Sequence, residues 1–302
     1  MKPFNIKKIL VPIDFSKTGN NALKQAINLG NASKAKIKLV NIVVPIDTTP
    51  SDSLLPWGDT FYNKAIKNAT EELRKIAKKI NESNKIEIEY EVKLGSVNGE
   101  VCNMAKKEKF DLIVMGTHGT SGVKEFFAGS NAYKIVNNAV CPVLTVQKIP
   151  VRKELKSIVL PIRLEMNSRQ KVDYAVKFAQ LFNATVFITG YTDDKSKSKQ
   201  FKVKQYVAQV EKYLTKLGVK FKSKAIFADN FTKEILNHAY KNHADLIMIM
   251  KHHDFSLEQL VKGPYAEQFV NHSIIPVLSI PVFSNPDMIK NQTFLTAGDF
   301  PY

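Results

Sequence analysis

The sequence has little of several features that would point to particular classes of protein. It holds two cysteines and one tryptophan among 302 residues. No apolar run approaches the roughly 20 residues that span a bilayer, and the N-terminus lacks the apolar stretch and cleavage site of a secretory signal. We therefore expect a cytoplasmic protein with no membrane segment. The two cysteines, Cys102 and Cys141, lack metal-ligand spacing and are predicted to be buried free thiols.

Arginine is also scarce, although the net charge is +16. Only four of the 44 basic residues are arginine, and the 22 basic and 14 acidic residues of 1–150 are matched by equal numbers in 151–302. Proteins that read nucleic acid specifically use arginine forks and interleaved aromatic residues. This even lysine excess predicts a solvated surface with no specific nucleic-acid partner, and only weak nonspecific association with polyanions.

The length suits two domains of about 150 residues, and the chain repeats itself. One pair of matching segments is offset by 149 residues, and two pairs are offset by 134. The matches are KKILVPID (7–14) with KSIVLPIR (156–163), FDLIVM (110–115) with ADLIMI (244–249), and AVCPVLTV (139–146) with SIIPVLSI (273–280).

The different offsets make the first half about 15 residues longer in its middle. A stretch rich in Pro, Thr and Ser at 45–59 is the predicted insertion and reads as a loop. We expect domains at 1–150 and 151–281, followed by an irregular extension at 282–302.

Strand and helix patterns alternate through the first half. Ser16 is a predicted N-cap. This order predicts two tandem Rossmann-like or flavodoxin-like domains, each a mostly parallel five-stranded sheet flanked by helices. The predicted strands are 8–13, 36–43, 86–92, 111–115 and 142–146, and the predicted helices are 17–31, 60–82, 98–108 and 129–138.

Ligands of such sheets bind beyond the carboxyl ends of the strands. After the strand DLIVM comes Gly116-Thr117-His118-Gly119, then nine residues, then Gly129-Ser130 at a helix start. Glycines let backbone N–H groups approach a phosphate, and a helix start adds free donors. No lysine stands where a Walker loop has one.

The spacing G-x2-G-x9-G-[ST], the opening VPIDFS and the closing CPVLTV together resemble the universal stress protein family over nearly the whole chain. The resemblance implies an ATP site in the first half. Pro12, Ile13 and Asp14 would lie beside the adenosine, Ile42 against adenine, and Met115 and Gly116 at the pocket floor. The phosphates would be held by Gly119, Gly129, Ser130 and Asn131.

Other interpretations stay open. The glycines could serve only turns, and Asp14 could be a cap before the helix. His118 could contact phosphate or act as a base, although packing or hydrogen bonding is favoured. A divalent ion such as Mg²⁺ could bridge the phosphates, but no acidic cluster marks a ligand set. His252, His253 and Asp254 lack a further ligand at fixed spacing, so no metal site is expected.

In the second half Gly116 corresponds to Met250, Gly119 to His253, Ser130 to Pro264 and Asp14 to Arg163, while Gly263 matches Gly129. The second half is therefore expected not to bind ATP in the same way. The resemblance implies that the last strands, 142–146 and 276–280, pair antiparallel within the chain, which would cover two apolar edges. Association into a homodimer is left open.

The leading hypothesis is a binding module, an ATP-responsive regulator in the stress response, with no catalytic residues. The alternatives are a slow ATPase and a nucleotide-free interaction or chaperone-like protein. The downstream partner, the inducing stress and the preferred adenine nucleotide are not readable from the sequence.

Overall fold

The computed structural model describes residues 4–45, 57–83, 86–117, 130–147, 154–251 and 265–282. The chain divides into two compact units. Ile6–Val151 is called the first unit, and Arg152–Tyr302 together with Met1–Asn5 is called the second unit.

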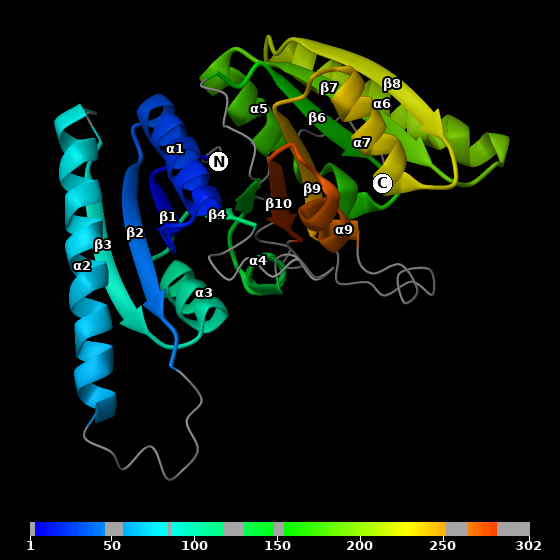
Figure 1. The fold of residues 1–302 in the computed structure, drawn as a ribbon. Helices are drawn as coiled ribbons and strands as arrows, with labels where there is room; N and C mark the ends of the chain where they lie inside the picture. Colours follow the sequence, from blue (N-terminus) through cyan, green and yellow to red (C-terminus); the bar gives the residue numbers. More distant parts are fainter. Residues whose placement is uncertain are drawn as a thin grey trace. The chain divides into compact units, whose positions relative to one another are not determined.

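Strands and helices alternate in both units (Figure 1). The first unit consists of β1 (Lys8–Pro12), α1 (Lys17–Ser33), β2 (Lys36–Val43), α2 (Trp57–Ser83), β3 (Ile88–Leu94), α3 (Val97–Lys107), β4 (Leu112–Gly116), α4 (Ser130–Asn138) and β5 (Val143–Val146). The second unit consists of β6 (Ser157–Ile162), the 3₁₀ turn η2 (Met166–Arg169), α5 (Val172–Phe182), β7 (Thr185–Thr192), α6 (Lys197–Lys216), β8 (Phe221–Phe227), α7 (Phe231–Lys241), β9 (Leu246–Lys251), α9 (Tyr265–His272) and β10 (Val277–Pro281).

The strands of the first unit lie in the order β3-β2-β1-β4-β5, and those of the second in the equivalent order β8-β7-β6-β9-β10. Neighbouring strands within each unit pair in parallel. In the first unit the chain adds β2 and β3 on one side of β1 and then crosses over to add β4 and β5 on the other side. The second unit does the same around β6, so the strand order reverses beside β1 and beside β6. The fold class predicted from the sequence, α/β with tandem parallel sheets, is confirmed.

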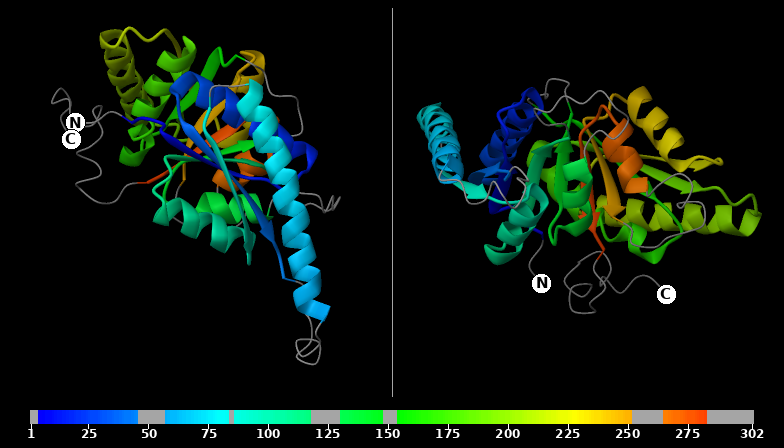
Figure 2. Two further views of the ribbon diagram at one scale, coloured as in Figure 1. Left: turned by 90° about the vertical axis from the view of Figure 1, so that its left-hand side faces the viewer. Right: turned by 60° about the horizontal axis from the view of Figure 1, so that its bottom comes forward.

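Helices cover both faces of the sheet in the first unit. In Figure 2, α1 and α2 lie on one face and α3 and α4 on the other. The long helix α2 shows why: Leu73, Ala77 and Ile80 recur at helical spacing and are buried against β2 and β3. Polar residues occupy its other side, so packing against the sheet supplies most of the stability of this helix.

The internal repeat extends to individual hydrogen bonds. Asp111, just before β4, accepts hydrogen bonds from the backbone N–H groups of Lys7 and Lys8, at 2.8 and 2.9 Å. Asp245, just before β9, accepts them from Lys156 and Ser157. In each unit one carboxylate thus joins the starts of two neighbouring strands.

Most predicted elements agree with the structure to within one or two residues. The largest difference is α2, which begins at Trp57 inside the stretch predicted as a loop. The rest of that stretch from residue 46, and the predicted extension from residue 283, lie outside the described residues. The cysteine prediction is half right, because Cys141 is buried but Cys102 is half-buried. Burial raises the pKa of the Cys141 thiol to about 12.

No helix in the described part of the chain is long and apolar enough to cross a membrane.

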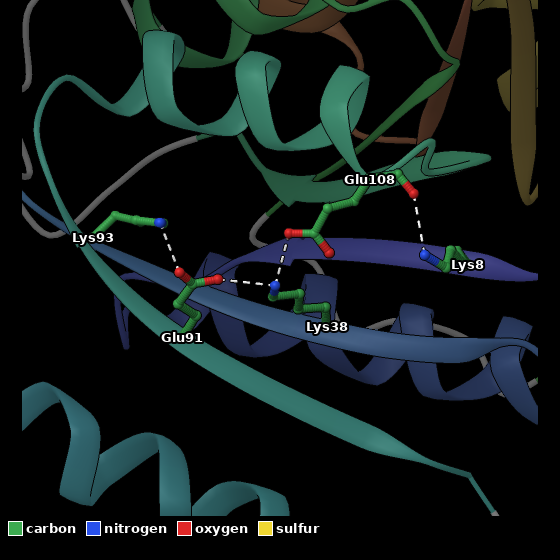
Figure 3. A network of polar contacts seen from close by, with 5 residues as sticks. All are labelled: Lys8, Lys38, Glu91, Lys93 and Glu108. Carbon is green, nitrogen blue, oxygen red and sulfur yellow. Dashed lines mark hydrogen bonds and ion pairs between the residues drawn. The ribbon is translucent and has the colours of Figure 1, made fainter.

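One polar network ties α3 to the strands beneath it (Figure 3). Lys38 on β2 lies between Glu91 on β3, at 2.9 Å, and Glu108 at the end of α3, at 2.8 Å. Lys93 pairs with the other oxygen of Glu91, and Lys8 donates to the backbone carbonyl of Glu108. Burial opposes the charge of Lys38, but the hydrogen bonds to Glu108 and Glu91 outweigh it and raise its pKa.

We predict that Lys38→Met destabilises the protein by about 1–2 kcal/mol near neutral pH, because two half-buried carboxylates lose their shared partner. Hydrogen bonds from Lys38 and then Lys93 lower the pKa of Glu91 below its ordinary 4.5. The stabilisation is thus present above that value and is lost as the pH falls through the folded-state pKa. Urea unfolding of both proteins from about pH 7 to about pH 3 should show the difference shrinking.

The matched control is Lys36→Met on the same strand, whose partner Glu87 is about as exposed as Lys36 itself, with 54% and 56% of the side chains accessible. This change should leave the unfolding midpoint almost unaltered. Equal losses in the two variants would contradict the special role of Lys38.

Candidate functional site

The parallel register brings three strand ends of the first unit to one edge of the sheet. Pro12 is level with Val40, and Leu10 with Ile113. Continuing both registers places Asp14 level with Ile42 and Ile13 level with Gly116. The predicted site residues at the ends of β1, β2 and β4 are therefore neighbours, because β1 lies between β2 and β4.

Asp14 is half-buried in a tight turn that starts α1. Its Oδ1 accepts a hydrogen bond from the backbone N–H of Ser16 at 3.0 Å, and the Oγ of Ser16 accepts one from Gly19 at 3.0 Å. The N-cap prediction for Ser16 is confirmed. Asp14 orders the residues just before the cap, and its carboxylate still has acceptor capacity for a ligand hydroxyl.

Between Asp14 and Ser16, the backbone of Phe15 adopts the left-handed region, with φ of 62°. Four other described residues that are not glycine share this conformation, and they form two repeat pairs, Lys34 with Asn183 and Lys109 with His243. Phe15 has no such counterpart. Strained backbone is often found at functional sites. Among the described residues, only the first unit has such a residue at this strand end.

Gly116 permits the end of β4 to approach the first turn of α1. A Cβ at this position would lie 2.8 Å from the backbone carbon of Thr18 and 3.0 Å from the backbone nitrogen of Gly19. The atoms in the way are mainly backbone, so they cannot rotate aside. Gly116 therefore has a packing role in addition to any role toward a ligand.

Apolar residues form the inner side of this edge. Ile13 and Met115 are buried, with 3% and 6% of their surface exposed, and Ile42 is half-buried. The side chain of Asn41 donates to the carbonyl oxygen of Ile13 at 2.8 Å, which ties β1 to β2 beyond their last paired residues. The described residues of this edge thus combine apolar surface with the carboxylate of Asp14.

The helix α4 begins at Ser130. Because β4 and β5 are parallel, α4 must start at the edge where β4 ends, which is also the edge with Asp14 and Gly116. Its first N–H groups have no partners within the helix. Asn131 in the first turn is exposed. His118, Gly119, Gly129 and the side chain of Ser130 lie outside the described residues.

A buried polar cluster beside Gly116 was not anticipated from the sequence. The hydroxyl of Thr117 donates to the Oε1 of Gln147 at 2.6 Å, and the side chain of Asn21 donates to the backbone carbonyl of Gln147 at 3.1 Å. All three residues are buried. The sequence did hold a signal for this cluster, namely the polar residues at positions 18, 21 and 25, which share the inward face of α1.

The equivalent edge of the second unit is built differently. Met250 takes the place of Gly116 and is buried, and Arg163 takes the place of Asp14. His252, His253, Asp254, Gly263 and Pro264 lie outside the described residues. In the part of the chain that is described, no group of three or more His, Cys, Asp or Glu residues could hold a metal ion.

The sequence model of the universal stress protein family matches residues 5–147 and again 154–281. Universal stress protein MJ0531 of Methanocaldococcus jannaschii is 35% identical over 143 residues, covering 47% of this chain and 82% of its own. Universal stress protein Sll1388 of a Synechocystis strain is 32% identical over 152 residues, covering 46% of this chain and 97% of its own.

A solved universal stress protein from Archaeoglobus fulgidus superposes with a TM-score of 0.74 at 18% identity, over 93% of this chain and 98% of that one. At this level of sequence identity, the similarity to that structure supports the fold alone. The two family matches decide the family: the chain belongs to the universal stress proteins and carries two of their domains in tandem.

We predict that Gly116→Ala destabilises the protein by about 1–3 kcal/mol, because the added methyl group must displace backbone rather than a flexible side chain. Chemical denaturation of the full chain measures the loss. An unchanged denaturation midpoint would show that the start of α1 can shift without cost. Gly116 would then have no packing role, and only its role toward a ligand would remain.

Proposed function

We propose that the first unit binds ATP, one molecule per chain, and that the protein is a nucleotide-responsive regulator in the cytoplasmic stress response. The observation that supports this best is the convergence of Asp14, Ile42 and Gly116 on the sheet edge where α4 begins. The apolar surface of Ile42 and Ile13 suits an adenine ring, and the Asp14 carboxylate suits a ribose hydroxyl.

The phosphates would lie toward the start of α4, where unpaired N–H groups and the helix dipole favour an anion. Gly119, Gly129, Ser130 and Asn131 are the proposed phosphate contacts, with His118 beside them, and Pro12 and Met115 would complete the apolar wall. A divalent ion such as Mg²⁺ would be held mainly by the phosphates, since only Asp14 at this edge offers a carboxylate among the described site residues.

The proposal gives the two units different tasks. At the positions of Asp14 and Gly116 the second unit has Arg163 and Met250, so a nucleotide placed there would meet a guanidinium and a bulky side chain. We propose that the second unit instead supports the first through pairing of β5 with β10. Both are apolar strands at the edge of their own unit's sheet, where an uncovered edge invites association.

The stoichiometry tests the site. Isothermal titration of the full chain with ATP and magnesium should give one site, and Gly119→Val should weaken binding at least about tenfold by crowding the phosphates. Ser223→Val, at an exposed position of β8 in the second unit, is the control for an added Val side chain, and it should leave the affinity unchanged. Two nucleotides per chain, or unaltered affinity in Gly119→Val, would refute the assignment.

Hydrolysis distinguishes a regulator from an enzyme. We expect turnover of ATP with magnesium below about one per hour, far under the 1–10³ s⁻¹ typical of enzymes. His118→Ala should not change this background. Faster turnover that His118→Ala abolishes would favour the slow ATPase, with His118 as its base.

A further inference from the structure

The second unit has a largely enclosed cavity of about 20 Å³ at the carboxyl ends of β6 and β9. A single water molecule needs about 10–15 Å³ of such space. The cavity is therefore the right size for one species as large as water. Arg163, Lys171 and Ser168 supply its polar wall, and Phe231 and Tyr265 supply aromatic surface.

Arg163 is held rigidly on this cavity. Its guanidinium lies 4.8 Å from the ring centre of Phe231 and 4.7 Å from that of Tyr265, and its Nη2 pairs with Glu165 at 2.8 Å. Contact with aromatic rings leaves the N–H groups of a guanidinium available in its plane. Glu165 uses part of this donor set, so further donors remain for a ligand.

Lys171 is buried on the same cavity, with 2% of its surface exposed. Its ammonium donates to the backbone carbonyl and the hydroxyl of Ser168, which are both uncharged. No carboxylate in the described residues forms an ion pair with Lys171. A fully buried ammonium without a counter-charge is costly, and only a ligand or proton loss relieves that cost.

The first unit provides an internal comparison. The positions equivalent to Arg163 and Lys171 are Asp14 and Ala22, and the position equivalent to Glu165 is Ser16. At these three positions the second unit thus has two cations and one carboxylate, where the first unit has one carboxylate and no cation. With Lys171 protonated, these three positions together carry one net positive charge.

We propose that the cavity of the second unit binds a single small monovalent anion, of the size of chloride, between Arg163 and Lys171. The anion supplies the counter-charge that the described residues lack. The guanidinium and the ammonium each donate to it, and the aromatic rings and Met250 exclude larger ions. This site is separate from the nucleotide site proposed for the first unit.

Binding is coupled to the protonation of Lys171. Burial lowers the pKa of the free Lys171 amine to about 7, with Arg163 acting in the same direction and Glu165 opposing it. Among the described residues that line the cavity, the phenol of Tyr265 is the remaining ionisable group. A neutral amine offers no charge to an anion, so affinity for chloride should fall roughly tenfold for each pH unit above the pKa.

The test uses the full chain without nucleotide, titrated with sodium chloride against sodium gluconate at constant ionic strength. Chloride should raise the thermal midpoint in proportion to the logarithm of its concentration above the dissociation constant, by roughly 2–4 °C at tenfold excess, and less at pH 9 than at pH 6. A flat response at both pH values would overturn the proposal, leaving a neutral lysine beside a water molecule.

Two variants separate binding from general salt effects. Lys171→Met fills the space with an apolar chain and should abolish the chloride response, even if its own midpoint is higher. Lys156→Met removes an exposed lysine paired with Glu154 and should keep the full response. A response retained in Lys171→Met would contradict the site.

Crystals soaked in sodium bromide give a direct readout. An anomalous peak between the Arg163 guanidinium and the Lys171 ammonium is the expected result. Anomalous peaks confined to the protein surface would show adventitious binding only and would refute the proposal.

Discussion

The close approach of the end of β4 to the first turn of α1 is the constraint on which the candidate site depends. Residue 116 has no side chain, so the backbone of Thr18 and Gly19 comes within about 3 Å of where a Cβ would be. That contact sets the start of α1 against the sheet edge and holds the Asp14 turn in place. The buried link from Thr117 through Gln147 to Asn21 then fixes the same junction with hydrogen bonds.

The two units show how one topology can support two different edges. In both units an aspartate before the fourth strand joins the starts of two strands. In both, a residue with left-handed backbone ends the first helix, and another lies just before the fourth strand. These shared features concern the ends of elements away from the site. The differences gather at the carboxyl ends of the strands, where the first unit has Asp14 and Gly116 and the second unit has Arg163 and Met250 at the equivalent positions. Structure is repeated where the fold requires it, and chemistry diverges where ligands bind.

Much of the fold could be predicted from the sequence because its signals are local. Apolar runs such as ILVP and LIVM, helical spacing in Leu73 and Ile80, and the cap at Ser16 each act over a few residues. The start of α2 was misjudged because Pro and Thr in 45–59 suggested a loop, whereas the helix extends back to Trp57. The half-buried position of Cys102 was missed because helical periodicity alone does not say how much of a helix a neighbour covers.

The sequence by itself determined the repeat, the alternation of strands and helices, the family resemblance and the set of residues at the strand ends. Only the tertiary structure decided which of these residues meet. The contact of Gly116 with Thr18, the polar cluster at Gln147, and the placement of Arg163 and Lys171 on one cavity join positions that are distant or unremarkable in the chain. Such contacts depend on strand register and on the depth at which a helix packs, and neither leaves a local signal in the sequence.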